Sequence, residues 1–299
     1  MVDMTSNAAG VDLIGSIVRY YEHTRFDYSS LWAHRSDPAF HYGYYDEHCR
    51  HHRRAVANAN ATLANFAGIR EGDKVLDAGC GRGASCFWLA AKLGARPVGV
   101  NLVKSQLDYA KKEAVRRGLS AQTEFRHADY TRTPFEAESF DVVWALESLC
   151  HSPRKIDFYS EAYRLLRPGG RLVVAEYMAT ENDMLPAERK LVADWLSGWS
   201  IPSLDTQTQH RQNAYEAGFE AVEVHNWTDR MRRSSLRLYC LAVICNWLSW
   251  VLNQIGLRSD VAHANLLSAS YQYEALQKGL WQYEILVAHK PRKTGRVVE

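Results

Sequence analysis

Short apolar runs alternate with amphipathic stretches over the middle of the chain, from about residue 72 to residue 227. Apolar runs of about four to eight residues are typical of buried strands, and the stretches between them repeat apolar positions at helical spacing. This order predicts an α/β fold, with a mostly parallel sheet covered by helices on both faces. The expected strands lie near 74–78, 96–101, 122–126, 140–145, 171–177, 220–226 and, after an interruption, 280–288.

The first two predicted core helices are each followed by a glycine, Gly94 and Gly118. Glycine adopts the left-handed conformation that commonly ends a helix. We therefore expect both helices to stop at these residues.

The hydrophobic pattern divides the chain into four parts. Residues 1–70 are rich in aromatic side chains and are predicted to be helical, and residues 71–227 form the predicted α/β core. Residues 228–279 interrupt the sheet, and residues 280–299 hold the last strand and a tail. We find no internal repeat.

The most apolar stretch of the interruption is Leu238–Leu252. It is shorter than the ~20 residues needed to cross a hydrocarbon core, so we expect no integral membrane span. A buried helix is the favoured interpretation. Such a helix would cover an apolar substrate pocket or pack against another subunit. A homo-oligomer could therefore form through this helix or through the N-terminal helices. A peripheral membrane contact is the less favoured alternative.

Composition fits a soluble enzyme with one large core. The 299 residues are 46% hydrophobic and 23% charged, and the net charge is +2. Scattered charge of this size gives no reason to expect nucleic acid or an anionic membrane as the main partner. The six cysteines show no CxxC pair, which favours reduced thiols, and the first twenty residues do not resemble a signal peptide. We expect a cytoplasmic protein.

The run Val75–Gly83 carries the most specific chemical signal. An apolar strand ends on Asp77 and enters a turn with Gly79, Gly81 and Gly83, which allow a ligand to approach the backbone closely. The spacing Gly79-x-Gly81-x-x-Ala84 also fits a dinucleotide-binding turn. Asp77 would repel a pyrophosphate, however, and the next strand ends on Asn101 rather than on a ribose-binding acid. A ligand that carries a sulfonium and an ammonium fits better, and S-adenosylmethionine is such a ligand.

This run resembles the first motif of the class I S-adenosylmethionine-dependent methyltransferases, in the branch of the sterol C24- and tocopherol methyltransferases. Three further stretches resemble later motifs of that branch in the same order: Val98–Leu102 with Ser105-Gln106, His127–Tyr130, and Leu165–Leu172. The resemblance implies a Rossmann-like seven-stranded sheet. It also implies an antiparallel last strand, preceded by a helical substrate lid at 228–279.

The same resemblance assigns cofactor contacts. Asp77 would pair with the ammonium group, and the glycines Gly79, Gly81 and Gly83 would lie beneath the methionyl moiety. Asn101 would hold the ribose with one donor and one acceptor. The adenine amino group would donate to Asp129. The motifs also place three neighbours at the cofactor: Leu102, the backbone of Tyr130 and Gln106, for which a solvent-facing position is the alternative.

The predicted fourth strand leads into Trp144–Pro153, which resembles the corresponding stretch of sterol C24-methyltransferases and of C-methyltransferases that act on prenyl groups. These enzymes methylate a carbon–carbon double bond and pass through a carbocation. The resemblance implies Glu147 as the base or the stabilising negative charge, with His151 orienting it or relaying its proton. A Pro-Pro tetrapeptide of the kind that holds nucleic-acid amines is absent, which disfavours base methylation.

Aromatic faces would stabilise such a cation by about 2 kcal/mol each when desolvated. Tyr21 is the candidate assigned to the catalytic site. The other candidates lie in or near the matched motifs: Tyr20, Tyr42, Tyr44, Tyr45 and Trp144.

Two basic clusters leave an alternative open. Arg50, Arg53 and Arg54 interleave with His48, His51 and His52, which favours a solvated basic face over a metal site. These arginines, or the group Arg230, Arg232 and Arg233, would alternatively bind an anionic head group such as a prenyl diphosphate.

Three functions are therefore carried forward. The leading hypothesis is an S-adenosylmethionine-dependent C-methyltransferase that acts on an alkene carbon of a hydrophobic isoprenoid. The second is a small-molecule O- or N-methyltransferase with Glu147 or His151 as general base. The third is a non-catalytic protein of the same fold, which the intact glycines and Asp77 argue against.

Overall fold

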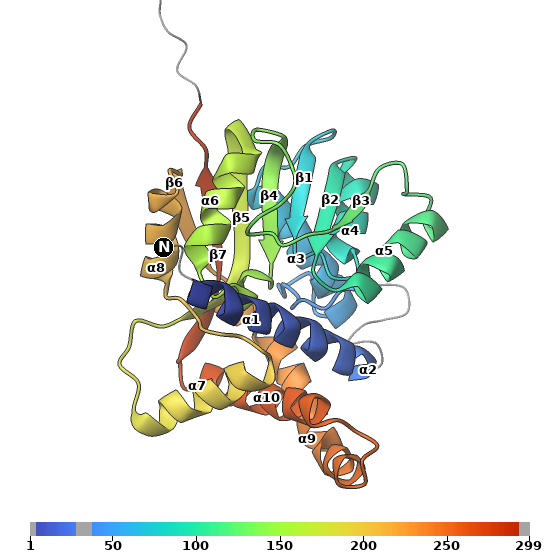
Figure 1. Cartoon of the computed structure of the whole chain (residues 1–299), viewed down its shortest axis with the longest axis vertical. Helices are drawn as coiled ribbons and strands as arrows, with labels where there is room; N and C mark the ends of the chain where they lie inside the picture. Colours follow the sequence, from blue (N-terminus) through green and yellow to red (C-terminus); the bar gives the residue numbers. More distant parts are fainter. Residues whose placement is uncertain (1–3, 28–37, 293–299) are drawn as a thin grey trace, which may run out of the picture.

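A seven-stranded sheet forms the centre of the protein (Figure 1). The computed structural model describes residues 4–27 and 38–292. The strand order is β3-β2-β1-β4-β5-β7-β6, and β7 runs antiparallel to both of its neighbours. The strands are β1 (Lys74–Ala78), β2 (Arg96–Asn101), β3 (Glu124–His127), β4 (Phe140–Leu146), β5 (Leu166–Ala179), β6 (Glu220–Asn226) and β7 (Trp281–His289). The predicted α/β class is confirmed.

Alternate residues of the central strands enter two separate cores. Val142 and Trp144 of β4 pack into one core, whereas Val143 and Ala145 pack into the other. This follows from the two-residue period of a strand, and because both faces are covered, the strands read as nearly continuous apolar runs. The helices of the sheet layers are α3 (His52–Phe66), α4 (Ala84–Leu93), α5 (Lys104–Arg116), α6 (Lys155–Leu165) and α8 (Gln207–Glu216).

The two predicted helix ends are confirmed. Gly94 follows α4 with a φ of 66°, and Gly118 lies just beyond α5 with a φ of 69°. Both are in the left-handed conformation, in which glycine carries no Cβ penalty.

A second helical layer lies beside the ends of the parallel strands (Figure 1). It contains α1 (Met4–His23), α2 (Arg25–Asp27), α7 (Pro186–Gly198), α9 (Thr228–Gln254) and α10 (Asp260–Gln277), with α9 and α10 inserted between β6 and β7. The short 3-10 helix η2 (Leu149–His151) follows β4.

The favoured interpretation of Leu238–Leu252 as a buried helix is wrong. This stretch is part of the 27-residue helix α9, which is long and apolar enough to cross a membrane by length and composition alone. Only 17% of its most apolar window is buried. Ser235 and Ser249 face α10, whereas large apolar residues such as Ile244 and Trp247 are exposed.

Candidate active site

A cavity of about 520 Å³ opens between the carboxyl ends of the strands and the helical layer. The sheet contributes the glycine turn and the end of β4, and α1, α9 and α10 contribute an apolar wall that includes Ile17, Leu238 and Leu266. Ligands of open α/β sheets bind at this edge. The cavity is also large enough for a cofactor with a small substrate.

The glycine turn leaves room for a ligand at one position in particular. A Cβ on Gly81 would have no atom closer than 3.9 Å, and its φ is 52°. Gly79 and Gly83 play a different part, because a Cβ would lie 2.4 Å from Ser148 at the first and 2.8 Å from Phe125 at the second. Gly79 lines the cavity, whereas Gly83 begins α4 and allows close packing.

Asp77 lies at the end of β1 with its side chain against the cavity. The carboxylate accepts a hydrogen bond from the Cys86 thiol, with a distance of 3.2 Å between Sγ and Oδ2. Burial raises the pKa of Asp77 to about 7, and the hydrogen bond from Cys86 offsets only part of that shift. A thiol is a weak donor, so a bound ammonium would stabilise this carboxylate far better.

Asn101 and Gln106 form the next part of the wall. The Asn101 amide nitrogen donates to Gln106 Oε1 over 2.7 Å, and both residues line the cavity together with Leu102. Gln106 is buried, so the solvent-facing alternative for it is wrong. The Asn101–Gln106 pair presents both donors and acceptors where a ribose would lie.

Asp129 and Tyr130 close this end of the cavity. Asp129 Oδ1 accepts hydrogen bonds from the backbone and the hydroxyl of Thr131, at 2.8 and 2.7 Å. The Tyr130 hydroxyl donates to the Ser148 carbonyl oxygen at 2.9 Å. Both residues are thus held in place. The described lining residues, from Asp77 at the glycine turn to Tyr130 after β3, fit S-adenosylmethionine.

Glu147 is held by three donors from three distant parts of the chain. Its carboxylate accepts hydrogen bonds from the Tyr177 hydroxyl, the Tyr283 hydroxyl and the Tyr42 backbone, each at 2.8 Å. Its φ of 51° is unusual for a residue with a side chain, and such strain is typical of functional sites. Burial raises the pKa of Glu147 to about 7 despite these donors.

Among the described residues His151 does not hydrogen-bond to Glu147, so the prediction that it orients Glu147 is wrong. Its Nδ1 lies 3.1 Å from the Ser200 carbonyl oxygen and its Nε2 lies 2.9 Å from the Tyr21 hydroxyl. A carbonyl only accepts, so Nδ1 carries the proton and Nε2 accepts from Tyr21. The described hydrogen-bond donors to Glu147 are Tyr42, Tyr177 and Tyr283, so His151 orients Tyr21 rather than Glu147. Burial lowers the pKa of His151 to about 4, which keeps the ring neutral.

The aromatic candidates divide into two groups. Tyr20, Tyr21 and Tyr42 line the cavity. The other three do not lie among the described lining residues, and their proposed role is therefore wrong. Trp144 is fully buried in the core, Tyr44 packs on Trp227, and the Tyr45 hydroxyl lies 2.9 Å from His52 Nδ1.

The two arginine clusters also lie outside the described cavity wall. The arginines that line it are instead Arg82 and Arg154. The Arg82 guanidinium stacks 5.0 Å from the Phe40 ring centre, and Arg154 pairs with Asp157 at 3.4 Å. Within the described residues no group of three potential metal ligands occurs.

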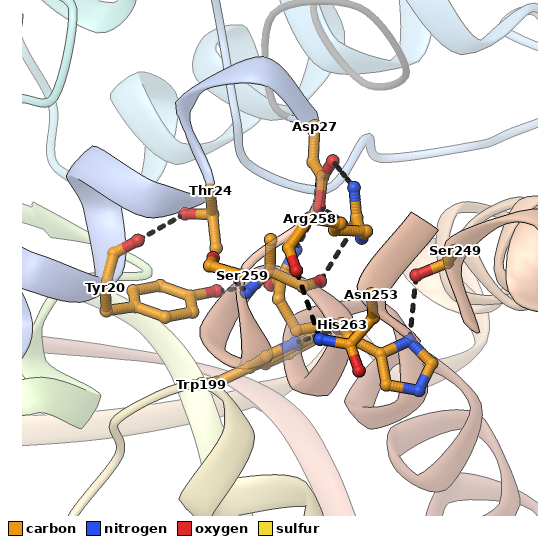
Figure 2. A network of polar contacts seen from close by, with 11 residues as sticks. Tyr20, Thr24, Asp27, Trp199, Ser249, Asn253, Arg258, Ser259 and His263 are labelled. Carbon is orange, nitrogen blue, oxygen red and sulfur yellow. Dashed lines mark hydrogen bonds and ion pairs between the residues drawn. The ribbon is translucent and has the colours of Figure 1, made fainter. Parts of the chain in front are cut away.

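A polar network fastens the N-terminal helices over the cavity (Figure 2). Arg258 forms two hydrogen bonds to Asp27, at 2.9 and 2.6 Å, and both side chains are largely buried. The Tyr20 hydroxyl donates to Asn265 Oδ1 at 2.6 Å. These contacts join α1 and α2 to the α9–α10 pair, so the cavity is closed by segments more than two hundred residues apart in sequence.

Sequence reasoning missed Tyr177, Tyr283 and Trp199. Tyr177 and Trp199 line the cavity, and Tyr177 is paired with Tyr283 in the β5–β7 ladder. Because paired residues of antiparallel strands point to the same face, both hydroxyls reach Glu147. Their signal was a tyrosine at a buried position in each strand, but only the strand order shows that they meet.

Comparison with known proteins agrees with this geometry. The family model described as a methyltransferase domain matches residues 76–174. The sterol 24-C-methyltransferase of Saccharomyces cerevisiae is 34% identical over 58% of this chain and 46% of its own length. The 27-O-demethylrifamycin SV methyltransferase of Amycolatopsis mediterranei is 32% identical over 63% of this chain and 70% of its own length. The chloroplastic tocopherol O-methyltransferase of Arabidopsis thaliana is 26% identical over 92% and 82%, respectively.

Solved structures share the fold at low sequence identity. A geranyl diphosphate methyltransferase in complex with GPP and sinefungin superposes with a TM-score of 0.73 at 20% identity, over 93% of this chain and 99% of that one. The geranyl diphosphate C-methyltransferase of Streptomyces coelicolor A3(2) superposes with a TM-score of 0.68 at 20% identity, over 93% and 98%.

The fold and the glycine-turn site define a class I methyltransferase. The chain belongs to the S-adenosylmethionine-dependent methyltransferases and is related to the sterol 24-C- and tocopherol O-methyltransferases. It matches a little under half the length of the sterol methyltransferases.

Proposed function

We propose that this protein methylates an alkene carbon of a neutral, isoprenoid-like substrate and that Glu147 steadies or deprotonates the cation formed on that substrate. The single observation that carries the proposal is the buried Glu147 carboxylate beneath an aromatic wall. S-adenosylmethionine, when bound at the glycine turn, supplies the electrophilic methyl group.

The wall around Glu147 suits a positive intermediate. Tyr42, Tyr177 and Trp199 lie on the same side of the cavity, and Tyr42 and Tyr177 meet edge to face, 5.8 Å apart. Aromatic rings stabilise a desolvated cation, and a carboxylate in a low-dielectric site does so more strongly. The neutral His151 adds no competing positive charge.

The substrate class follows from charge and shape. The solved geranyl diphosphate methyltransferases bind a diphosphate, which requires cationic partners. Here Arg82 is stacked on aromatic rings and Arg154 is paired with Asp157, while the carboxyl groups of Asp77 and Glu147 line the same cavity. This balance disfavours a dianionic head group and favours a neutral prenylated or sterol-like molecule.

Methyl transfer to oxygen or nitrogen is the second candidate. A general base works best when its pKa lies near the operating pH, and that of Glu147 is raised to about 7. The tocopherol O-methyltransferase also matches most of this chain. In this alternative Glu147 would remove a hydroxyl or amine proton from the substrate.

Glu147→Gln separates the two candidates, and Tyr283→Phe is its matched control, because it removes one hydrogen bond but keeps the carboxylate. For Glu147→Gln we expect cofactor affinity to survive and turnover to fall by ~10²–10⁴. In alkene methylation the residual products of the Gln variant should shift toward alcohols or rearranged alkenes, since the cation is quenched by water or by a hydride shift. A single O- or N-methylated product, with activity recovered at high pH, would support the second candidate instead. Full activity at neutral pH would remove Glu147 from both mechanisms.

A further inference from the structure

The C-terminal half of α9 and the turn after it expose a concentrated apolar surface, here called the α9 tip. Half of the fourteen large apolar side chains found exposed in the described structure lie in this one stretch of fifteen residues. Soluble proteins rarely expose a contiguous apolar patch without a partner for it. The exposed fractions range from 52% to 76% for Val243, Ile244, Trp247, Leu248, Trp250, Ile255 and Leu257.

The orientation of α9 is fixed by polar contacts on its inner side. The Ser235 hydroxyl donates to Gln272 at 2.6 Å, and Ser249 lies 2.8 Å from His263 Nδ1, as Figure 2 shows for the second pair. A surface helix normally turns its apolar face to the core and its polar face to water. Here serines face α10 and tryptophans face outward, so the hydrogen bonds to α10 hold the apolar side of the helix toward solvent.

The distribution of charge along the helix indicates what covers the tip. Residues 238–257 contain no charged side chain, whereas Arg230, Arg232 and Arg233 lie in the first half of α9. An uncharged segment that carries tryptophans matches the interface of a bilayer, and Arg230 and Arg233, which are exposed earlier on the same helix, favour anionic lipids. Figure 1 shows the end of α9 and the turn into α10 at the lower edge of the molecule, away from the sheet, where a flat surface can reach it.

The same helix also forms part of the cavity wall. Leu238, Leu241 and Ala242 line the cavity from α9, directly before the exposed residues begin. A hydrophobic substrate dissolved in a bilayer would therefore meet the protein at the helix that borders its pocket.

We propose that the α9 tip docks onto the surface of a lipid bilayer that contains anionic lipids, with Ile244, Trp247 and Leu248 entering the interface. Docking places the cavity beside membrane-dissolved substrate. It does not depend on whether methyl transfer goes to carbon or to oxygen.

Vesicle flotation tests this proposal without any substrate. The full-length protein is mixed with phosphatidylcholine vesicles, with or without phosphatidylserine, and tryptophan emission is recorded. We expect binding that is stronger with phosphatidylserine, weaker at high salt, and accompanied by a blue shift. The double variant Ile244→Glu/Trp247→Glu should bind about tenfold or more weakly, since it places two charges in the interface. Its cofactor affinity should be unchanged.

Val115→Glu is the matched control, because Val115 is 70% exposed on α5 and isolated from the tip. It should bind vesicles as the parent protein does. Retained binding in the double variant would overturn the proposal. So would a parent protein that ignores vesicles but forms a dimer that the double variant dissociates, because the tip would then be a subunit interface.

Discussion

Asp77 should make cofactor affinity depend on pH in a bell-shaped manner. Its pKa is raised to about 7 by burial, and an ammonium pairs only with the charged carboxylate. Affinity should therefore fall by about tenfold for each pH unit below that value. The α-amino group of the ligand titrates near ~8, so affinity should fall again above that pH. We expect tightest binding between about pH 7 and pH 8.

Asp77→Asn should remove the acid limb of this profile. Losing one partner of a buried charge pair costs ~3–5 kcal/mol, which corresponds to about 10²-fold or more in Kd. Isothermal titration calorimetry over a pH series measures both effects. Asp108→Asn, on the exposed side of α5, is the control and should keep the parent profile. An Asp77→Asn variant with parent affinity and an unchanged acid limb would refute the assignment of Asp77 to the ammonium group.

Three further predictions concern the turn, the N-terminal helix and Glu147. Gly81→Val should abolish cofactor binding while circular dichroism shows an intact fold, because its side chain enters open cavity space at a φ of 52°; parent affinity would contradict this. Deletion of residues 1–24 should lower turnover far more than cofactor affinity, since Ile17, Tyr20 and Tyr21 wall the cavity, and a fully active truncated enzyme would show that this wall is dispensable. Glu147→Gln should melt at a higher temperature than the parent protein, by a margin that grows as pH rises from about 4.5 to about 7. Because the pKa of this carboxyl is higher in the folded protein than in the unfolded chain, its ionisation favours unfolding over this pH window. A difference in melting temperature that does not change with pH would contradict this prediction.

Local sequence determined the sheet and the turn that holds the cofactor. The central strands β1, β2, β4 and β7 are mainly apolar runs, and backbone geometry sends alternate residues to opposite faces whatever lies beside them. The glycines at 79, 81 and 94 are required where the backbone adopts a positive φ, a constraint that acts within a few residues. These features depend on neighbours along the sequence, so the strands, the helix ends and the position of Asp77 could be predicted.

The surroundings of Glu147 were decided by tertiary structure. The sequence placed this acid at the end of β4, but its partners are Tyr42 from the N-terminal segment, Tyr177 from β5 and Tyr283 from β7. Only the pairing of β5 with β7 brings the two hydroxyls together. A sequence motif gives the position of a residue on a helix or strand but not its tertiary contacts. This explains the errors over His151, Tyr44, Tyr45 and Trp144.

The outward face of α9 is the clearest case of a property that composition alone could not give. An apolar stretch is equally consistent with a buried helix and with an exposed one, because hydrophobic burial is non-directional and depends on what packs beside it. Ser235 and Ser249 find hydrogen-bond partners on α10, and those partners turn the tryptophans outward. The sequence determined that α9 is a helix and apolar, whereas the packing against α10 decided which of its faces meets water.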